Sequence, residues 1–221
     1  MCNRPLLHCT SLSIYTKQSV SWSVGINEEW VVTRLLQLGA EVNSRPTYES
    51  QTALQEVCAY GAMSSKVMDR QERVIRLLVA HGADVNAASG NLKWRSTPLQ
   101  LIAGWYEPSH ATQAKAIHSR RQFLHLIAHG ARLNAGSGLF SCIAMQLCAS
   151  HGDIEKAMLL VQHRAGRNDH LACDESSDFE APVWRSALDL AARNGRMDMT
   201  QYLLNIGALS VSPGTTGYQG Q

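Results

Sequence analysis

The chain has 221 residues, of which 45% are hydrophobic and 17% are charged, a balance typical of a folded core rather than a disordered segment. Its net charge of +2 is too small to indicate a protein that binds nucleic acid or an anionic membrane. No apolar run approaches the ~18 residues that a membrane-spanning helix needs, and the N-terminal stretch lacks the apolar centre of a signal peptide.

Six cysteines lie at uneven spacings, which does not indicate a disulfide framework. Two of them, Cys58 and Cys148, fall at equivalent positions of a repeated pattern, and we interpret these two as small core residues. The cysteine pattern favours a reduced intracellular protein, located in the cytoplasm, the nucleus or both.

A short pattern recurs along the chain: two apolar residues, two further residues, and then Gly-Ala. Four clear copies end at Gly39-Ala40, Gly82-Ala83, Gly130-Ala131 and Gly207-Ala208, and a worn copy ends at Arg164-Ala165. Recurrence on this scale predicts stacked repeats, each of which buries its apolar face only against its neighbours.

Each copy of the pattern ends a helix that we expect to be the second of its repeat. In the clearest copy, Val74, Ile75, Leu78 and Val79 have helical spacing, and Gly82 would supply a left-handed C-cap. An asparagine follows four residues after the glycine position, where its short amide could close a turn through its own backbone. These residues are Asn43, Asn86, Asn134 and Asn168.

The start of each first helix carries the resemblance to a known family. Residues 97–103 read TPLQLIA, which resembles the ankyrin signature T-P-L-H-x-A, and related stretches begin at Thr52, Ile143 and Ser186. The threonine would cap the helix and Pro98 suits its first position. The TALQ form at 52–55 resembles ankyrin arrays common in fungal proteins. Gln55, Gln100, Gln146 and Asp189 replace the usual histidine, and glutamine could replace part of its inter-repeat hydrogen bonding.

The chain thus resembles an ankyrin-repeat protein, which implies an all-α solenoid of about five helix-turn-helix units with short hairpin fingers. We place the units at about 25–43, 44–86, 87–134, 135–168 and 169–211. Residues 1–24 are either a degenerate N-terminal cap or the start of a fragment of a larger protein, and 212–221 is expected to be a disordered tail.

Three stretches are longer than an ideal repeat needs. Residues 62–73 and 107–121 contain good helix formers, and we expect them to add turns to the second helices. The connection from Asn168 to Ser186 is acidic, and we expect it to be solvated and mobile.

Candidate chemistry is sparse. His125 and His129 could share a helix face as zinc ligands, but His129 recurs as a repeat feature, so we expect no metal site. Cys148 and His151 could form a thiolate pair, but Cys148 occupies a small core position, so we expect neither catalytic residues nor a cofactor. We interpret the basic run 118–121 as a solvated helix face rather than a nucleic-acid-binding patch.

The resemblance implies a non-catalytic scaffold or adaptor, a monomer that binds an unidentified protein partner on the concave face of fingers and first helices. Trp and Arg are enriched in interface hot spots, and two such pairs precede first helices. The partner-binding residues we expect are Trp94, Arg95, Trp184 and Arg185, with Tyr48 and Glu49 one repeat earlier. Two alternatives stay open: each tryptophan covers its own first helix, or the chain is an accessory or targeting segment of a larger enzyme or signalling protein.

Overall fold

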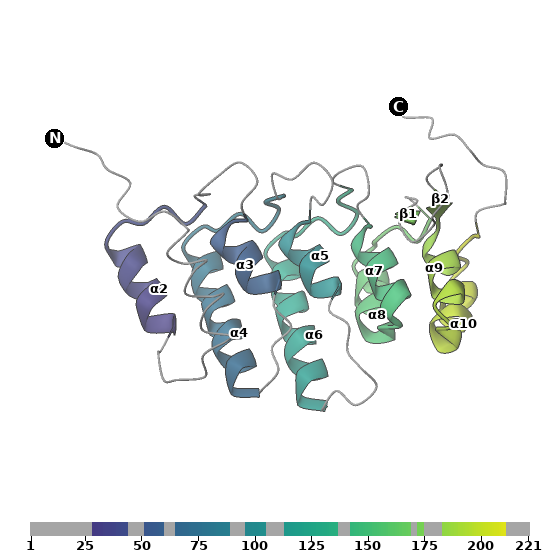
Figure 1. Cartoon of the computed structure of the whole chain (residues 1–221), viewed down its shortest axis with the longest axis horizontal. Helices are drawn as coiled ribbons and strands as arrows, with labels where there is room; N and C mark the ends of the chain where they lie inside the picture. The colour runs from purple at the N-terminus through teal and green to yellow at the C-terminus, as the bar shows by residue number, and fades with distance from the viewer. Residues whose placement is uncertain are drawn as a thin grey trace.

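The computed structural model describes residues 28–43, 51–59, 65–88, 96–104, 113–136, 142–168, 172–174 and 183–210. Within these residues the helices follow one another in a single row from one end of the molecule to the other (Figure 1). No helix in the described ranges is both long and apolar enough to cross a membrane. The helices are α2 (Glu28–Gln37), α3 (Ala53–Ala59), α4 (Ser65–Ala80), α5 (Pro98–Ala103), α6 (Gln113–Ala128), α7 (Ala144–His151), α8 (Ile154–Gln162), α9 (Ala187–Arg193) and α10 (Met197–Asn205).

The row has two layers. The first helices α3, α5, α7 and α9 contact one another in order, and so do the second helices α2, α4, α6, α8 and α10. Each first helix also contacts the second helix that follows it, as α3 does with α4. Apolar side chains from both layers form one continuous core, in which Leu78 and Leu126 are fully buried as their repeat positions predict. Cys58 and Cys148 are also fully buried, so their interpretation as core residues is confirmed.

The recurring pattern is explained by the way each second helix ends. The N–H of Gly82 donates to Val79 O at 3.0 Å, and that of Ala83 donates to Leu78 O at 3.0 Å. This pair of bonds is a Schellman motif, which needs a left-handed residue just past the helix. The same two bonds recur at the ends of the other second helices, at Gly39-Ala40, Gly130-Ala131, Arg164-Ala165 and Gly207-Ala208.

The recurring asparagines link neighbouring repeats, so the prediction that each closes a turn on its own backbone is wrong. Asn43 Nδ2 donates to Gly82 O at 2.9 Å, and Asn43 Oδ1 accepts from the N–H of Asp84 at 2.8 Å. Asn86 makes the same pair of bonds to Gly130 and Arg132. The amide reaches the next helix end because stacking brings that end beside it, and local sequence carries no information about this placement.

The two insertions do lengthen second helices. Helices α4 and α6 have 16 residues each, whereas α8 and α10 have 9. In Figure 1, α4 and α6 accordingly extend further from the loop edge than α8 does. The basic run on α6 is not a fully solvated face, however. His118 and Ser119 are buried, because α6 packs along the equally long α4.

The long acidic connection is partly structured, which corrects the expectation of a mobile loop throughout. Strand β1 (Ala172–Asp174) pairs antiparallel with β2 (Val183–Arg185). Strand pairing satisfies backbone groups that a solvated loop would leave to water. This connection therefore carries a short two-stranded sheet, while the other elements of the described ranges are helices.

Candidate functional site

The starts of the first helices α3, α5 and α7 are each capped by a glutamine side chain from inside the helix. Gln100 Oε1 accepts the backbone N–H of Thr97 at 2.7 Å, and the Thr97 hydroxyl accepts the N–H of Gln100 at 3.3 Å. This reciprocal arrangement is a capping box. Gln55 and Gln146 accept the corresponding N–H groups of Thr52 and Ile143 at 2.9 and 2.8 Å.

The other end of the same amide holds the connection that leads into the next repeat. Gln55 Nε2 donates to the carbonyls of Ala87, at 3.0 Å, and Ser96, at 2.8 Å. Gln100 Nε2 donates in the same way to Ala135 O, at 2.6 Å, and Cys142 O, at 3.0 Å. One buried glutamine thus caps its own helix and fixes both ends of the next finger.

The later repeats vary this arrangement. Gln146 Nε2 donates to Arg185 O at 3.5 Å, a longer contact than those of the earlier glutamines. In α9, Asp189 Oδ2 accepts from the Ser186 N–H at 2.9 Å, and Asp189 Oδ1 accepts from the Ser210 hydroxyl. An ionised carboxylate has no N–H to donate, so Asp189 can cap its helix but cannot hold carbonyl groups as glutamine does.

Of the expected partner-binding residues, two lie in the described part of the chain. Trp184 and Arg185 are on β2, where their backbones pair with Cys173 and Ala172. The Arg185 side chain is half-buried. Tyr48, Glu49, Trp94 and Arg95 lie outside the described residues. In sequence, Trp94 and Arg95 directly precede Ser96, whose carbonyl Gln55 holds.

The Cys148 thiol does not have the surroundings of a nucleophile. Its side chain is fully buried, and burial raises its pKa well above the ordinary range, which disfavours the thiolate. His151 lies one turn on, and burial lowers its pKa despite the hydrogen bond between Nδ1 and Leu147 O at 2.9 Å. The Cys148 thiol is therefore part of the core, and the His151 ring binds a backbone carbonyl of its own helix.

His125 of α6 and His129, which directly follows the end of α6, have ring centroids 4.2 Å apart. His129 Nδ1 lies 2.8 Å from His125 O, where it donates to a carbonyl of the last helical turn. Desolvation, followed by the charge of His129, lowers the pKa of His125. Among the described residues there is no group of three or more side chains suited to hold a metal ion.

The sequence analysis did not predict two polar networks that the structure contains. His118 bridges α6 to α4, with Nε2 3.2 Å from Asp69 Oδ1 and Nδ1 3.3 Å from Glu72 Oε2. Burial raises the pKa of the Glu72 carboxyl, but hydrogen bonds from Arg76 and His118 outweigh this effect and leave the pKa below its ordinary value. The residues are far apart in sequence, so only the stacking of α4 on α6 reveals the network.

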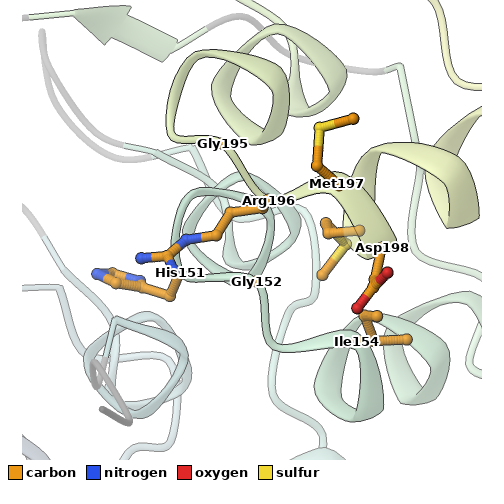
Figure 2. Close-up of a pocket in the computed structure, with 8 residues that line it drawn as sticks. His151, Gly152, Ile154, Gly195, Arg196, Met197 and Asp198 are labelled. Carbon is orange, nitrogen blue, oxygen red and sulfur yellow. The ribbon is translucent and has the colours of Figure 1, made fainter. Parts of the chain in front are cut away.

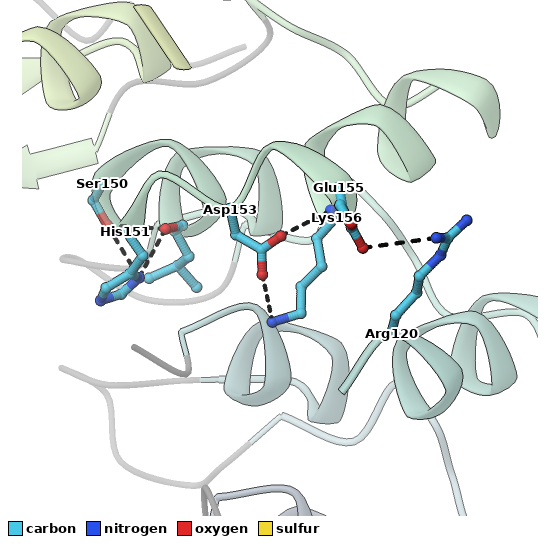
Figure 3. A network of polar contacts seen from close by, with 7 residues as sticks. Arg120, Ser150, His151, Asp153, Glu155 and Lys156 are labelled. Carbon is cyan, nitrogen blue, oxygen red and sulfur yellow. Dashed lines mark hydrogen bonds and ion pairs between the residues drawn. The ribbon is translucent and has the colours of Figure 1, made fainter. Parts of the chain in front are cut away.

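The second network contains a lysine that is almost fully buried (Figure 3). Lys156 Nζ lies 2.7 Å from Asp153 Oδ2, while Asp153 Oδ1 accepts the backbone N–H of Lys156 at 3.0 Å. The aspartate therefore caps α8 and neutralises the ammonium group, which a buried charge requires. Nearby, Glu155 on the same helix pairs with Arg120 of α6 at 3.7 Å. The sequence does contain a signal of this ion pair: Asp153 precedes Lys156 by three residues, and Lys156 stands at an apolar position of the repeat.

A shallow, open pocket of about 330 Å³ lies between two interhelical turns, those that join α7 to α8 and α9 to α10 (Figure 2). Arg196 lines it and donates from Nε to Ser150 O at 3.3 Å, which ties one turn to the other. The pocket is lined by His151, Gly152, Ile154, Gly195, Arg196, Met197, Asp198 and Met199. None of the expected partner-binding residues is among them.

Comparison with protein-family models finds a match in the last part of the described chain. Residues 184–212 match the family model for the ankyrin repeat, a stretch that contains α9, α10 and the last Gly-Ala pair. No curated protein matches the chain. The match at residues 184–212 supports the interpretation of the chain as an ankyrin-repeat protein. Ankyrin repeats generally mediate protein–protein interaction.

Proposed function

We propose that the chain is an ankyrin solenoid of five units that binds a protein partner on the face formed by its fingers and first helices. The units are those expected at about 25–43, 44–86, 87–134, 135–168 and 169–211. In this role the protein acts as an intracellular adaptor of the cytoplasm or nucleus, and its part in the complex is non-catalytic.

The proposal rests on the two roles of the buried glutamines, which cap their own helices and also bind the connection to the next repeat. Gln55 and Gln100 each tie the base of the following finger to a helix of the core. A finger whose base is fixed loses less conformational entropy when a partner binds, so more of the contact energy appears as affinity. Rigid bases at a regular spacing are what a recognition surface built from fingers requires.

The residues assigned to recognition are those next to the fixed positions. Trp94 and Arg95 precede Ser96, and Trp184 lies beside Arg185, whose carbonyl Gln146 holds. Tryptophan and arginine side chains contribute a large share of binding energy at protein interfaces. Tyr48 and Glu49 occupy the corresponding stretch one repeat earlier.

The test compares proteins captured from a cell extract by the wild-type chain, a Trp94→Ala/Trp184→Ala variant and a Met158→Ala variant. Met158 is exposed on α8, a second helix, and serves as the control. We expect the double variant to lose specific partners, with affinity for a purified partner reduced by ~2 kcal/mol or more. Helical circular dichroism of all three proteins should be the same.

Two results would contradict the proposal. Partners that bind the double variant as tightly as wild type would place recognition elsewhere on the molecule. Loss of helical structure in the double variant would instead show that the tryptophans cover their own first helices.

A further inference from the structure

Equivalent positions of the second helices can be counted from one fully or partly buried leucine in each. This leucine, whose carbonyl accepts the alanine N–H of the Schellman motif, is Leu35, Leu78, Leu126, Leu160 or Leu203. We define three positions from it. The front position is one residue later, the bridge position six residues earlier, and the rear position five residues earlier.

The front position packs toward the core in every second helix except α10. Leu36, Val79, Ile127 and Val161 occupy it and are half-buried against the core cluster. Leu204 occupies it in α10 and is 52% exposed. Because α10 is the last helix of the described row, no further described helix covers the apolar Leu204 side chain.

At two of the junctions between second helices, an ion pair joins the bridge position of one helix to the rear position of the next. Glu29 at the bridge of α2 pairs with Arg73 at the rear of α4 at 2.6 Å. Arg120 at the bridge of α6 pairs with Glu155 at the rear of α8 at 3.7 Å. Among the described helices, two residues at these positions have no second helix beyond them: Met197 at the bridge of α10 and Trp30 at the rear of α2.

Both of these residues are apolar and exposed. Met197 is 74% exposed and Trp30 is 66% exposed. The other rear positions carry charged residues, namely Arg73, Arg121, Glu155 and Asp198. Exposed large hydrophobic residues in the described ranges gather near these ends: five of the seven are Trp30, Leu38, Met197, Leu204 and Leu209. A tryptophan opposite a methionine makes a favourable sulfur–aromatic contact.

We propose that a second copy of this chain stacks on the first, with α10 of one copy against α2 of the next and Met197 against Trp30. The interface continues the packing that joins neighbouring second helices within one copy, and Leu204 becomes buried in it. Such a head-to-tail contact uses two different surfaces, so it leaves one of each free at the ends of a dimer and can propagate. The assembly departs from the monomer expected from sequence.

The test uses the full chain in three forms: wild type, Trp30→Glu and Leu204→Glu. Each variant places a charge on one of the two surfaces and leaves the other intact. Analytical ultracentrifugation over a roughly hundredfold concentration range should show a mass that rises with concentration for wild type and stays at one chain for each variant alone. An equimolar mixture of the two variants should form a species of two chains, because the intact α10 of Trp30→Glu meets the intact α2 of Leu204→Glu.

The control is Met158→Glu, which places the same charge on an exposed apolar residue of α8 and should associate like wild type. Circular dichroism verifies that each variant is folded, and Met197→Glu replaces Leu204→Glu if the latter fails to fold. A wild-type chain that stays monomeric throughout overturns the proposal. So does self-association of Trp30→Glu alone, which would indicate a symmetric contact between two α10 helices.

Discussion

Arg164 shows how a single residue departs from the repeat while the backbone keeps to it. Its φ is +66°, in the left-handed region that glycine occupies at the ends of the other second helices. The hydrogen bonds of the Schellman motif are nevertheless complete, with Arg164 N donating to Val161 O at 3.0 Å. Stacking on both sides therefore imposes a conformation that costs about 1–2 kcal/mol for a residue with a Cβ.

Replacing Arg164 with glycine should stabilise the protein. The strain is removed, while the greater freedom of glycine in the unfolded chain offsets part of the gain, so we expect the free energy of unfolding to rise by about 0.5–1 kcal/mol. Urea denaturation measures it. In the converse control, Gly130→Ala should lower stability by a similar amount through φ alone, because a Cβ there would meet nothing within 4 Å. Loss of stability in Arg164→Gly would show that the arginine side chain contributes more than its backbone costs.

Gln100 provides a second test at the residue scale. Methionine has a similar shape but no amide, so Gln100→Met leaves the Thr97 N–H and the carbonyls of Ala135 and Cys142 without this partner. Each buried polar group left unsatisfied costs about 1–3 kcal/mol, and we expect a total loss of at least ~2 kcal/mol in chemical denaturation. A loss of less than ~0.5 kcal/mol, as at an exposed position, would contradict the structural role of this glutamine.

At the scale of elements, length variation is confined to places where it does not disturb the stack. The longer helices α4 and α6 begin earlier than α8 and α10 relative to the core leucines, but they end in the same motif. They also lie next to each other, so the added turns contact one another through His118, Asp69 and Glu72. An insertion in one repeat is therefore supported by an insertion in its neighbour.

The acidic connection offers a prediction at this scale. Strands β1 and β2 hold its ends, so between α2 and α10 we expect a broad-specificity protease to cut first within residues 175–182, which mass spectrometry of the fragments can locate. Deleting 176–181 should leave the stack folded, since the entropy of loop closure depends only weakly on length. A first cut elsewhere between α2 and α10, or unfolding of the deletion variant, would show that this segment is part of the packed structure.

At the scale of the whole molecule, stability comes from contacts between neighbours in the row. The core is a band of residues that runs through all the described repeats, with Leu78 and Leu126 at equivalent and fully buried positions. In such a linear array a defect in one repeat weakens its neighbours most.

Leu126→Ala should therefore lower the free energy of unfolding by ~2–5 kcal/mol, because it leaves a cavity in a fully buried site. Gln162→Ala, at an exposed position of α8, should change it by less than ~0.5 kcal/mol. In the same samples Cys58 and Cys148 should resist alkylation until unfolding, since burial removes access and raises both thiol pKa values. Rapid alkylation of native Cys148 would contradict the core assignment.

The sequence alone determined the local elements and their order. The Leu-Leu-x-x-Gly-Ala pattern encodes the end of a helix in six adjacent residues, and TPLQ encodes its start in four. Both are contacts within one turn of backbone, so the residues that make them are neighbours in sequence. The extra turns of α4 and α6 follow from composition for the same reason.

Tertiary structure decided what each side chain touches across repeats. The asparagines reach the next helix end and not their own turn, the glutamines hold the next finger, and His118 meets two carboxylates on α4. Each of these contacts joins residues 30 or more positions apart, for example Asn43 with Gly82 and Gln55 with Ala87. Lys156 is buried for the same reason, because the packing of neighbouring helices, and not its local sequence, excludes water from it. Such pairs depend on the separation and register of stacked repeats, which the irregular insertions set and which no short stretch of sequence contains.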